Sequence, residues 1–102
     1  MTYVTKDEFR STFTSTTGGV MTEGAGAITG ELELFCRPEA GGLRVEIRYA
    51  GAGEWYTVSG SPVRVQGDPD DALGWVVRHL STPGPVVDGN EKPVTLEGSA
   101  GA

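Results

Sequence analysis

Cysteine and histidine are almost absent from this sequence, with one residue of each in a chain of 102. The single cysteine, Cys36, excludes an internal disulfide. One cysteine and one histidine, His79, do not supply the ligands of a zinc site without carboxylates or a second chain. We therefore expect no resident metal ion or cofactor, and a free thiol without a disulfide partner suits the reducing cytoplasm.

Long apolar runs and basic clusters are also missing. Residues 1–6 lack the basic start and apolar run of a secretory signal peptide, and no window has the length of a membrane span. Eight Lys and Arg residues stand against 14 Asp and Glu, which gives a net charge of −6 at pH 7. Because nucleic acids and anionic membranes require a positive protein surface, the composition argues against both as partners.

The negative charge is concentrated toward the C-terminal third of the chain. Residues 1–37 carry three basic and five acidic groups, residues 38–67 carry three of each, and residues 68–102 carry two basic and six acidic groups. An electrostatic partner should therefore be a protein with a basic surface.

Residues 68–82 combine the start signal, apolar face and stop signal of a helix. Asp68 suits the capping position, Pro69 suits the first helical position, and Pro83 follows the end. Apolar residues recur at helical spacing, namely Ala72, Leu73, Val76 and Leu80. Charges that complement the helix dipole lie at both ends: Asp70 and Asp71 at the start, Arg78 and His79 in the last turn.

Alternation of apolar and polar residues predicts antiparallel strands with one solvated face. The inward positions are Leu32, Leu34 and Cys36 in residues 31–36, and Leu43, Val45, Ile47 and Tyr49 in residues 43–49. Shorter strands are expected at 54–58 and 63–65, and residues 94–96 either add an edge strand or belong to a partly disordered tail. The predicted fold class is α+β, an antiparallel meander of three to four strands with one long helix (68–82) packed on one face.

The N-terminal region contains a capping box, with Thr5 as the cap and Glu8 at the third helical position. Phe9 and Phe13 then share one helical face. This pattern predicts a short helix at residues 6–13, and an edge strand is the alternative.

The length predicts a single domain covering residues 1–102. Sixteen glycines punctuate the chain. We expect frayed ends at 1–4 and 98–102, a flexible loop at 14–27 and an extended tail at 85–97.

No combination of residues predicts catalysis, a metal site or a cofactor site. Cys36 lies on an inward strand position, and His79 suits a helix C-terminus. The acidic residues at 68–71 enter a helix and lack the alternate spacing of a calcium loop. The α-β-β-β-α order resembles that of double-stranded RNA-binding domains, which would imply phosphate contacts, but the same acidic residues would repel phosphates.

The candidate interaction surface combines outward strand residues with the acidic helix start: Arg44, Arg48, Trp55, Asp70 and Asp71. Trp55 and Tyr56 are adjacent and point to opposite faces of a strand, so only one joins the core, and the sequence leaves open which one. An exposed Trp beside arginines is typical of interface anchors.

Three functions remain as hypotheses. The first is a small acidic, non-enzymatic protein-binding module of a regulatory, escort or immunity type. The second is a small-molecule binder or minimal enzyme with a pocket between sheet and helix. This pocket would be lined by Leu34, Tyr49, Tyr56 and Trp75, with His79 or Cys36 at its mouth. The third is a homo-oligomer that associates through a strand edge or the outer face of the sheet.

Overall fold

The computed structural model describes residues 3–4, 8–65 and 67–97. It is mostly antiparallel sheet with one helix, which agrees with the predicted α+β class. The elements in chain order are β1 (Tyr3–Val4), β2 (Phe9–Thr14), β3 (Val20–Thr22), β4 (Gly26–Ile28), β5 (Glu31–Glu39), β6 (Gly42–Tyr49), β7 (Tyr56–Thr57), β8 (Val63–Arg64), α1 (Pro69–Leu80), β9 (Val86–Val87) and β10 (Asn90–Glu91).

The main sheet has the strand order β1-β2-β5-β6-β7, and β8 also pairs with β6. All its pairings are antiparallel, and Leu34 of β5 lies opposite Ile47 of β6. Strands β5, β6 and β7 form the predicted meander. The sheet is larger than predicted, however, because β2 joins it beside β5 and β1 extends it further.

The predicted helix at residues 6–13 is wrong where the structure describes it. Residues 9–13 belong to β2, which pairs with β5 from Phe9 opposite Cys36 to Thr14 opposite Glu31. Residues 5–7 lie outside the described residues. A spacing of four places Phe9 and Phe13 on one face of either a helix or a strand, so their periodicity is ambiguous. The Ser, Thr and Phe residues that follow favour a strand, and pairing with β5 decides the outcome.

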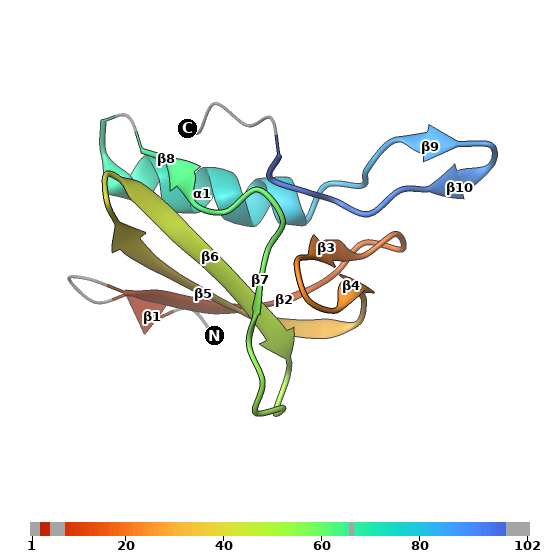
Figure 1. Cartoon of the computed structure of the whole chain (residues 1–102), viewed down its shortest axis with the longest axis horizontal. Coiled ribbons are helices and arrows are strands. Elements are labelled where there is room, and N and C mark those ends of the chain that lie inside the picture. The colour runs from red at the N-terminus through yellow and green to blue at the C-terminus, as the bar shows by residue number, and fades with distance from the viewer. Residues whose placement is uncertain (1–2, 5–7, 66, 98–102) are drawn as a thin grey trace.

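Helix α1 agrees with its local signals to within two residues at either end. The Asp68 carboxylate accepts a hydrogen bond from the Asp70 amide at 2.9 Å, and the helix begins at Pro69 and ends at Leu80. Ala72, Val76 and Leu80 are buried. Figure 1 shows α1 lying across one face of the main sheet.

The core lies between α1 and the inner face of the sheet. The predicted inward residues of β5 and β6 are buried in it, with one exception. Tyr49, the last residue of β6, is 43% exposed. Each fully buried Leu, Ile or Val side chain contributes roughly 1.5–3 kcal/mol to folding.

Residues 14–27, predicted as a loop, contain β3 and the start of β4. These strands form a hairpin in which Val20 lies opposite Ile28, and both side chains are buried. The Thr22 hydroxyl donates to the Gly26 carbonyl at 2.7 Å and accepts from the Ala25 amide. The hairpin was missed because its strands have only three residues each, separated by glycines.

The predicted tail, residues 85–97, begins with a second hairpin formed by β9 and β10. This hairpin projects beyond the body of the molecule in Figure 1. The chain then returns as residues 94–96, which we call the closing segment. Val94 forms a parallel bridge with Val20 and its amide donates to the Gly19 carbonyl, while the Leu96 amide donates to the Ser59 carbonyl. Val94 and Leu96 are buried, so this segment completes the core.

Gly60 shows how tightly the closing segment fits. Its φ is +96°, and a Cβ atom placed there would lie 2.2 Å from the Glu97 nitrogen. Only glycine combines this backbone conformation with such a close approach of two chain segments.

Candidate interaction surface

The side of the main sheet opposite α1, which we call the outer face, is formed by the outward residues of β2, β5, β6 and β7. Alternation places these residues there, because their neighbours along each strand point into the core. On β2, β5 and β6 the outer face carries four arginines and four glutamates: Arg10, Arg37, Arg44, Arg48, Glu31, Glu33, Glu39 and Glu46. The rest of the chain has four basic and ten acidic residues, so it holds the whole net charge of −6.

Arg48 forms the tightest ion pair on the outer face. Its Nε and Nη2 atoms donate to Glu33 Oε2 and Oε1 at 3.1 and 3.0 Å. The Gly51 amide also donates to Glu33 Oε2, at 3.1 Å. The pKa of Glu33 is therefore lowered, chiefly by the Arg48 hydrogen bond, then by the Gly51 amide, with a smaller attraction from Arg10.

Arg44 is held more loosely. It lies 3.6 Å from a Glu39 oxygen and 3.5 Å from a Glu46 oxygen, and its Nη2 donates to the Thr57 hydroxyl at 3.2 Å. These distances are longer than those of ordinary charge-assisted hydrogen bonds, so the Arg44 guanidinium does not use all its N–H donors on the two glutamates.

The pairing of β7 with β6 decides which neighbouring aromatic residue points outward. Tyr56 lies opposite the buried Ile47 and packs against the core, and Thr57 lies opposite Glu46 on the outer face. Trp55 consequently belongs to the outer face. Its ring lies 4.5 Å from the Arg48 guanidinium carbon, so two of the predicted surface residues are in direct contact.

Three residues at the centre of this surface were missed by the sequence prediction: Arg10, Phe35 and Arg37. Phe35 is half-buried and its ring centroid lies 5.6 Å from that of Trp55. The signal for Phe35 was present, because it occupies an outward position between Leu34 and Cys36. The signal for Arg10 was hidden by the incorrect helix prediction.

The other two predicted surface residues, Asp70 and Asp71, do not join this group. Both are exposed in the first turn of α1, which lies on the opposite side of the sheet. The predicted surface is therefore two surfaces: the outer face with Arg44, Arg48 and Trp55, and the acidic start of α1.

Cys36 and His79 occupy different environments from the outer face. Cys36 is 1% exposed, and burial raises the pKa of its thiol to about 12, which disfavours the reactive thiolate. His79 stacks on Trp75 with ring centroids 4.6 Å apart. Its Nε2 atom is 2.8 Å from the Thr95 carbonyl oxygen, and since a carbonyl only accepts, Nε2 carries the hydrogen.

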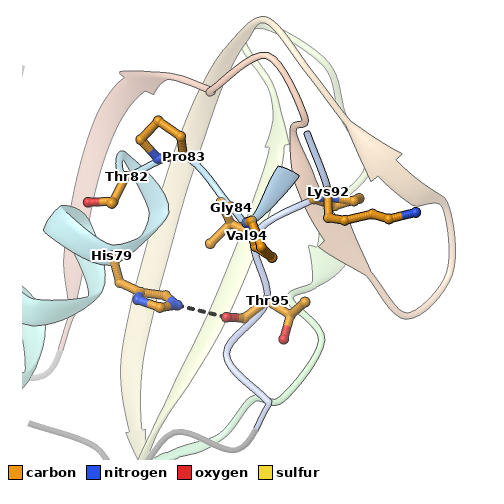
Figure 2. A pocket seen from close by; sticks show the side chains of 9 residues that line it. His79, Thr82, Pro83, Gly84, Lys92, Val94 and Thr95 are labelled. Atoms are coloured by element: carbon orange, nitrogen blue, oxygen red, sulfur yellow. Dashed lines mark hydrogen bonds between the residues drawn. The ribbon is translucent and has the colours of Figure 1, made fainter. Parts of the chain in front are cut away.

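A pocket of about 410 Å³ lies beside His79, between the end of α1 and residues 92–95. Figure 2 shows His79 and Thr95 at one side of it, with the Lys92 side chain directed away. Its walls are largely proline and backbone. Of the residues that the sequence placed around a pocket, Leu34 is 1% exposed in the core, and Tyr56 and Trp75 pack against the core.

Among the described residues, no group of three or more His, Cys, Asp or Glu side chains is placed to hold a metal ion. No helix in the described part of the chain is long and apolar enough to cross a membrane. No family model, curated protein or solved structure matches this chain.

Proposed function

We propose that this protein is a small, non-enzymatic protein-binding module of a regulatory, escort or neutralising type, and that it binds through the outer face. The observation that carries the proposal is the contact between Trp55, Phe35 and the surrounding arginines on the sheet face opposite α1. Trp and Arg are the residue types most enriched at the energetic centres of protein interfaces.

The Trp55 side chain is the anchor of this proposed interface. Its indole rests on the Arg48 guanidinium, and Arg48 is itself fixed by two hydrogen bonds to Glu33. An aromatic ring held in this way loses little conformational freedom when a partner covers it, so more of the contact energy appears as affinity.

The acidic remainder of the molecule supports a partner that has a basic region as well. Asp70 and Asp71 would contact such a region only if the partner reaches the α1 side of the sheet. The net charge disfavours nucleic acid and anionic membrane as partners, and we place the protein in the cytoplasm on the basis of its single unpaired cysteine.

Affinity capture from extract of the source cells tests this function. Wild-type protein should retain a stoichiometric partner that the Trp55→Ala variant loses, because the anchor has been removed. Tyr49→Ala is the matched control, since Tyr49 is an exposed aromatic residue away from the outer face. Absence of any stoichiometric partner, or equal retention by Trp55→Ala, would contradict the proposal.

The pocket beside His79 supports a second candidate, binding of a small molecule. Three prolines, Val94 and Gly84 are among its lining residues, which favours a compact, largely apolar ligand. A ligand screen by thermal shift tests it: stabilised wild type and an unresponsive His79→Ala variant would support this function.

A further inference from the structure

The four arginines of the outer face fall into two pairs. Arg44 and Arg48 are ion-paired with glutamates. Arg10 and Arg37 instead contact a ring: their guanidinium carbons lie 5.0 and 5.9 Å from the Phe35 ring centroid. Within the described part of the chain, no carboxylate oxygen lies within 4.0 Å of either guanidinium.

Arg48 combines two contacts on this face, one with an aromatic ring and one with a carboxylate. Its guanidinium lies over the Trp55 ring, while its Nε and Nη2 atoms donate to both oxygens of Glu33. The two contacts are compatible because a guanidinium stacks through its flat face and donates hydrogen bonds along its edge. A ring contact therefore leaves the N–H donors available for a carboxylate.

Arg10 and Arg37 have the ring contact without the carboxylate. Arg10 lies directly opposite Phe35 across the β2–β5 pairing, and Arg37 lies two residues further along β5 on the same face. Arg37 is also directly opposite Arg44 on β6. Like charges at opposite cross-strand positions repel, so a carboxylate placed here would relieve an unfavourable contact.

We propose that Arg10, Phe35 and Arg37, here called the Phe35 patch, bind the carboxylates of an acidic segment in a partner protein. The inference rests on the proposed function and adds the chemistry of the partner. The two guanidiniums receive carboxylates of the segment, as Arg48 receives Glu33, and the Phe35 ring contacts an apolar side chain between them.

The net charge of −6 does not prevent this contact. At physiological ionic strength the Debye length is about 8 Å, so exposed acidic groups farther away are largely screened. The partner segment is selected by the groups it touches. Those groups are two arginines around an aromatic ring, and the neighbouring glutamates Glu46 and Glu33 are already ion-paired with Arg44 and Arg48.

Selection from a random displayed peptide library tests the proposal. Wild-type protein should enrich peptides rich in Asp and Glu over the input library. The double variant Arg10→Gln with Arg37→Gln should lose this enrichment, and the dissociation constant of a selected acidic peptide should rise at least about tenfold. Arg78→Gln, which removes an exposed arginine from α1, is the matched control and should bind like wild type.

Circular dichroism and thermal melting of the variants confirm that each is folded before binding is measured. Enrichment of Lys-rich or Arg-rich peptides, binding of acidic peptides that is unchanged in the double variant, or no enrichment would each overturn the proposal. If cell-extract capture depends on Trp55 but not on Arg10 and Arg37, the binding function stands and the acidic-segment inference falls. If capture does not depend on Trp55 either, both the proposed binding function and the acidic-segment inference are contradicted.

Discussion

Single residues on the outer face differ in how completely the molecule satisfies their charge. Glu33 receives two hydrogen bonds from Arg48 and one from the Gly51 amide. In the described part of the chain, the close contacts of the Arg10 and Arg37 guanidiniums are with aromatic rings. The first group stabilises the fold, whereas the Arg10 and Arg37 guanidiniums have no carboxylate oxygen within 4.0 Å among the described residues.

Glu33 should make stability depend on pH in the acidic range. Its folded-state pKa lies below the ordinary value of 4.5, so its contribution is fully present above that value and is lost as pH falls through the folded pKa. Glu33→Gln should therefore lower the free energy of unfolding at neutral pH by at most about 1 kcal/mol, since the pair is partly solvated.

Urea denaturation from neutral pH to below pH 4 measures this effect. The difference between wild type and Glu33→Gln should shrink as the pH falls, and Glu23→Gln, at an exposed turn position, should show no such trend. A difference that grows on acidification would contradict the assignment.

Cys36 should be chemically inert in the folded protein. Its thiol is buried and has a pKa of about 12, so both access and thiolate formation are suppressed. Mass spectrometry after treatment with iodoacetamide at pH 8 should show unmodified native protein and full modification in guanidinium chloride. Rapid modification of the native protein would indicate an exposed thiol and contradict this environment.

At the scale of elements, prediction succeeded where local signals and tertiary packing agree. Helix α1 has its capping residue, its apolar face and the charges that complement its dipole within one segment. In β5 and β6, apolar and polar residues alternate over enough positions to determine which side chains point inward. A strand at β2 was only the alternative to a helix, because the spacing of Phe9 and Phe13 fits a helix as well as a strand. Its conformation depends on pairing with β5, a partner about 20 residues away along the chain that no local signal specifies.

The interaction surface was predicted in part for the same reason. Arg44, Arg48 and Trp55 follow from alternation within their own strands. Arg10 reaches Phe35 only because β2 lies beside β5, and Arg37 lies just beyond the predicted strand 31–36. Asp70 and Asp71 were grouped with Arg44, Arg48 and Trp55 although α1 lies on the other side of the sheet. The sequence specifies which face a residue occupies more readily than which strands share that face.

The closing segment should contribute to stability as core, although the sequence suggested an extended tail. Leu96 is 1% exposed, and Leu96→Ala should lower the free energy of unfolding by about 2–5 kcal/mol through lost burial and a residual cavity. Val87→Ala, on the exposed hairpin strand β9, should change it by less than about 0.5 kcal/mol. Guanidinium denaturation compares the two variants, and equal small effects would show that residues 94–96 are not part of the core.

At the scale of the whole molecule, one core joins segments from most of the described chain. The Cα radius of gyration is 12.8 Å, close to the value of about 13 Å expected for one compact domain of this length. Buried residues come from the main sheet, from the β3–β4 hairpin, from α1 and from the closing segment. Helix α1 packs on one face of the main sheet, and the outer face is the opposite one.

This shared core predicts a single cooperative unfolding transition. Far-ultraviolet circular dichroism reports the sheet and helix, while tryptophan fluorescence reports Trp55 on the outer face and Trp75 on α1. Both signals should change at the same denaturant concentration and with the same slope. Separate transitions would show that the hairpins or the helix unfold independently of the sheet.

The closing segment also has a consequence for protein synthesis. Val94 and Leu96 pair with Gly19, Val20 and Ser59, residues that leave the ribosome much earlier. In the nascent chain, the core between the sheet and the helix stays incomplete until residue 96 has left the exit tunnel. During that interval the apolar surface that residues 94–96 cover in the native state faces solvent, and exposed apolar surface makes a folding intermediate prone to aggregation.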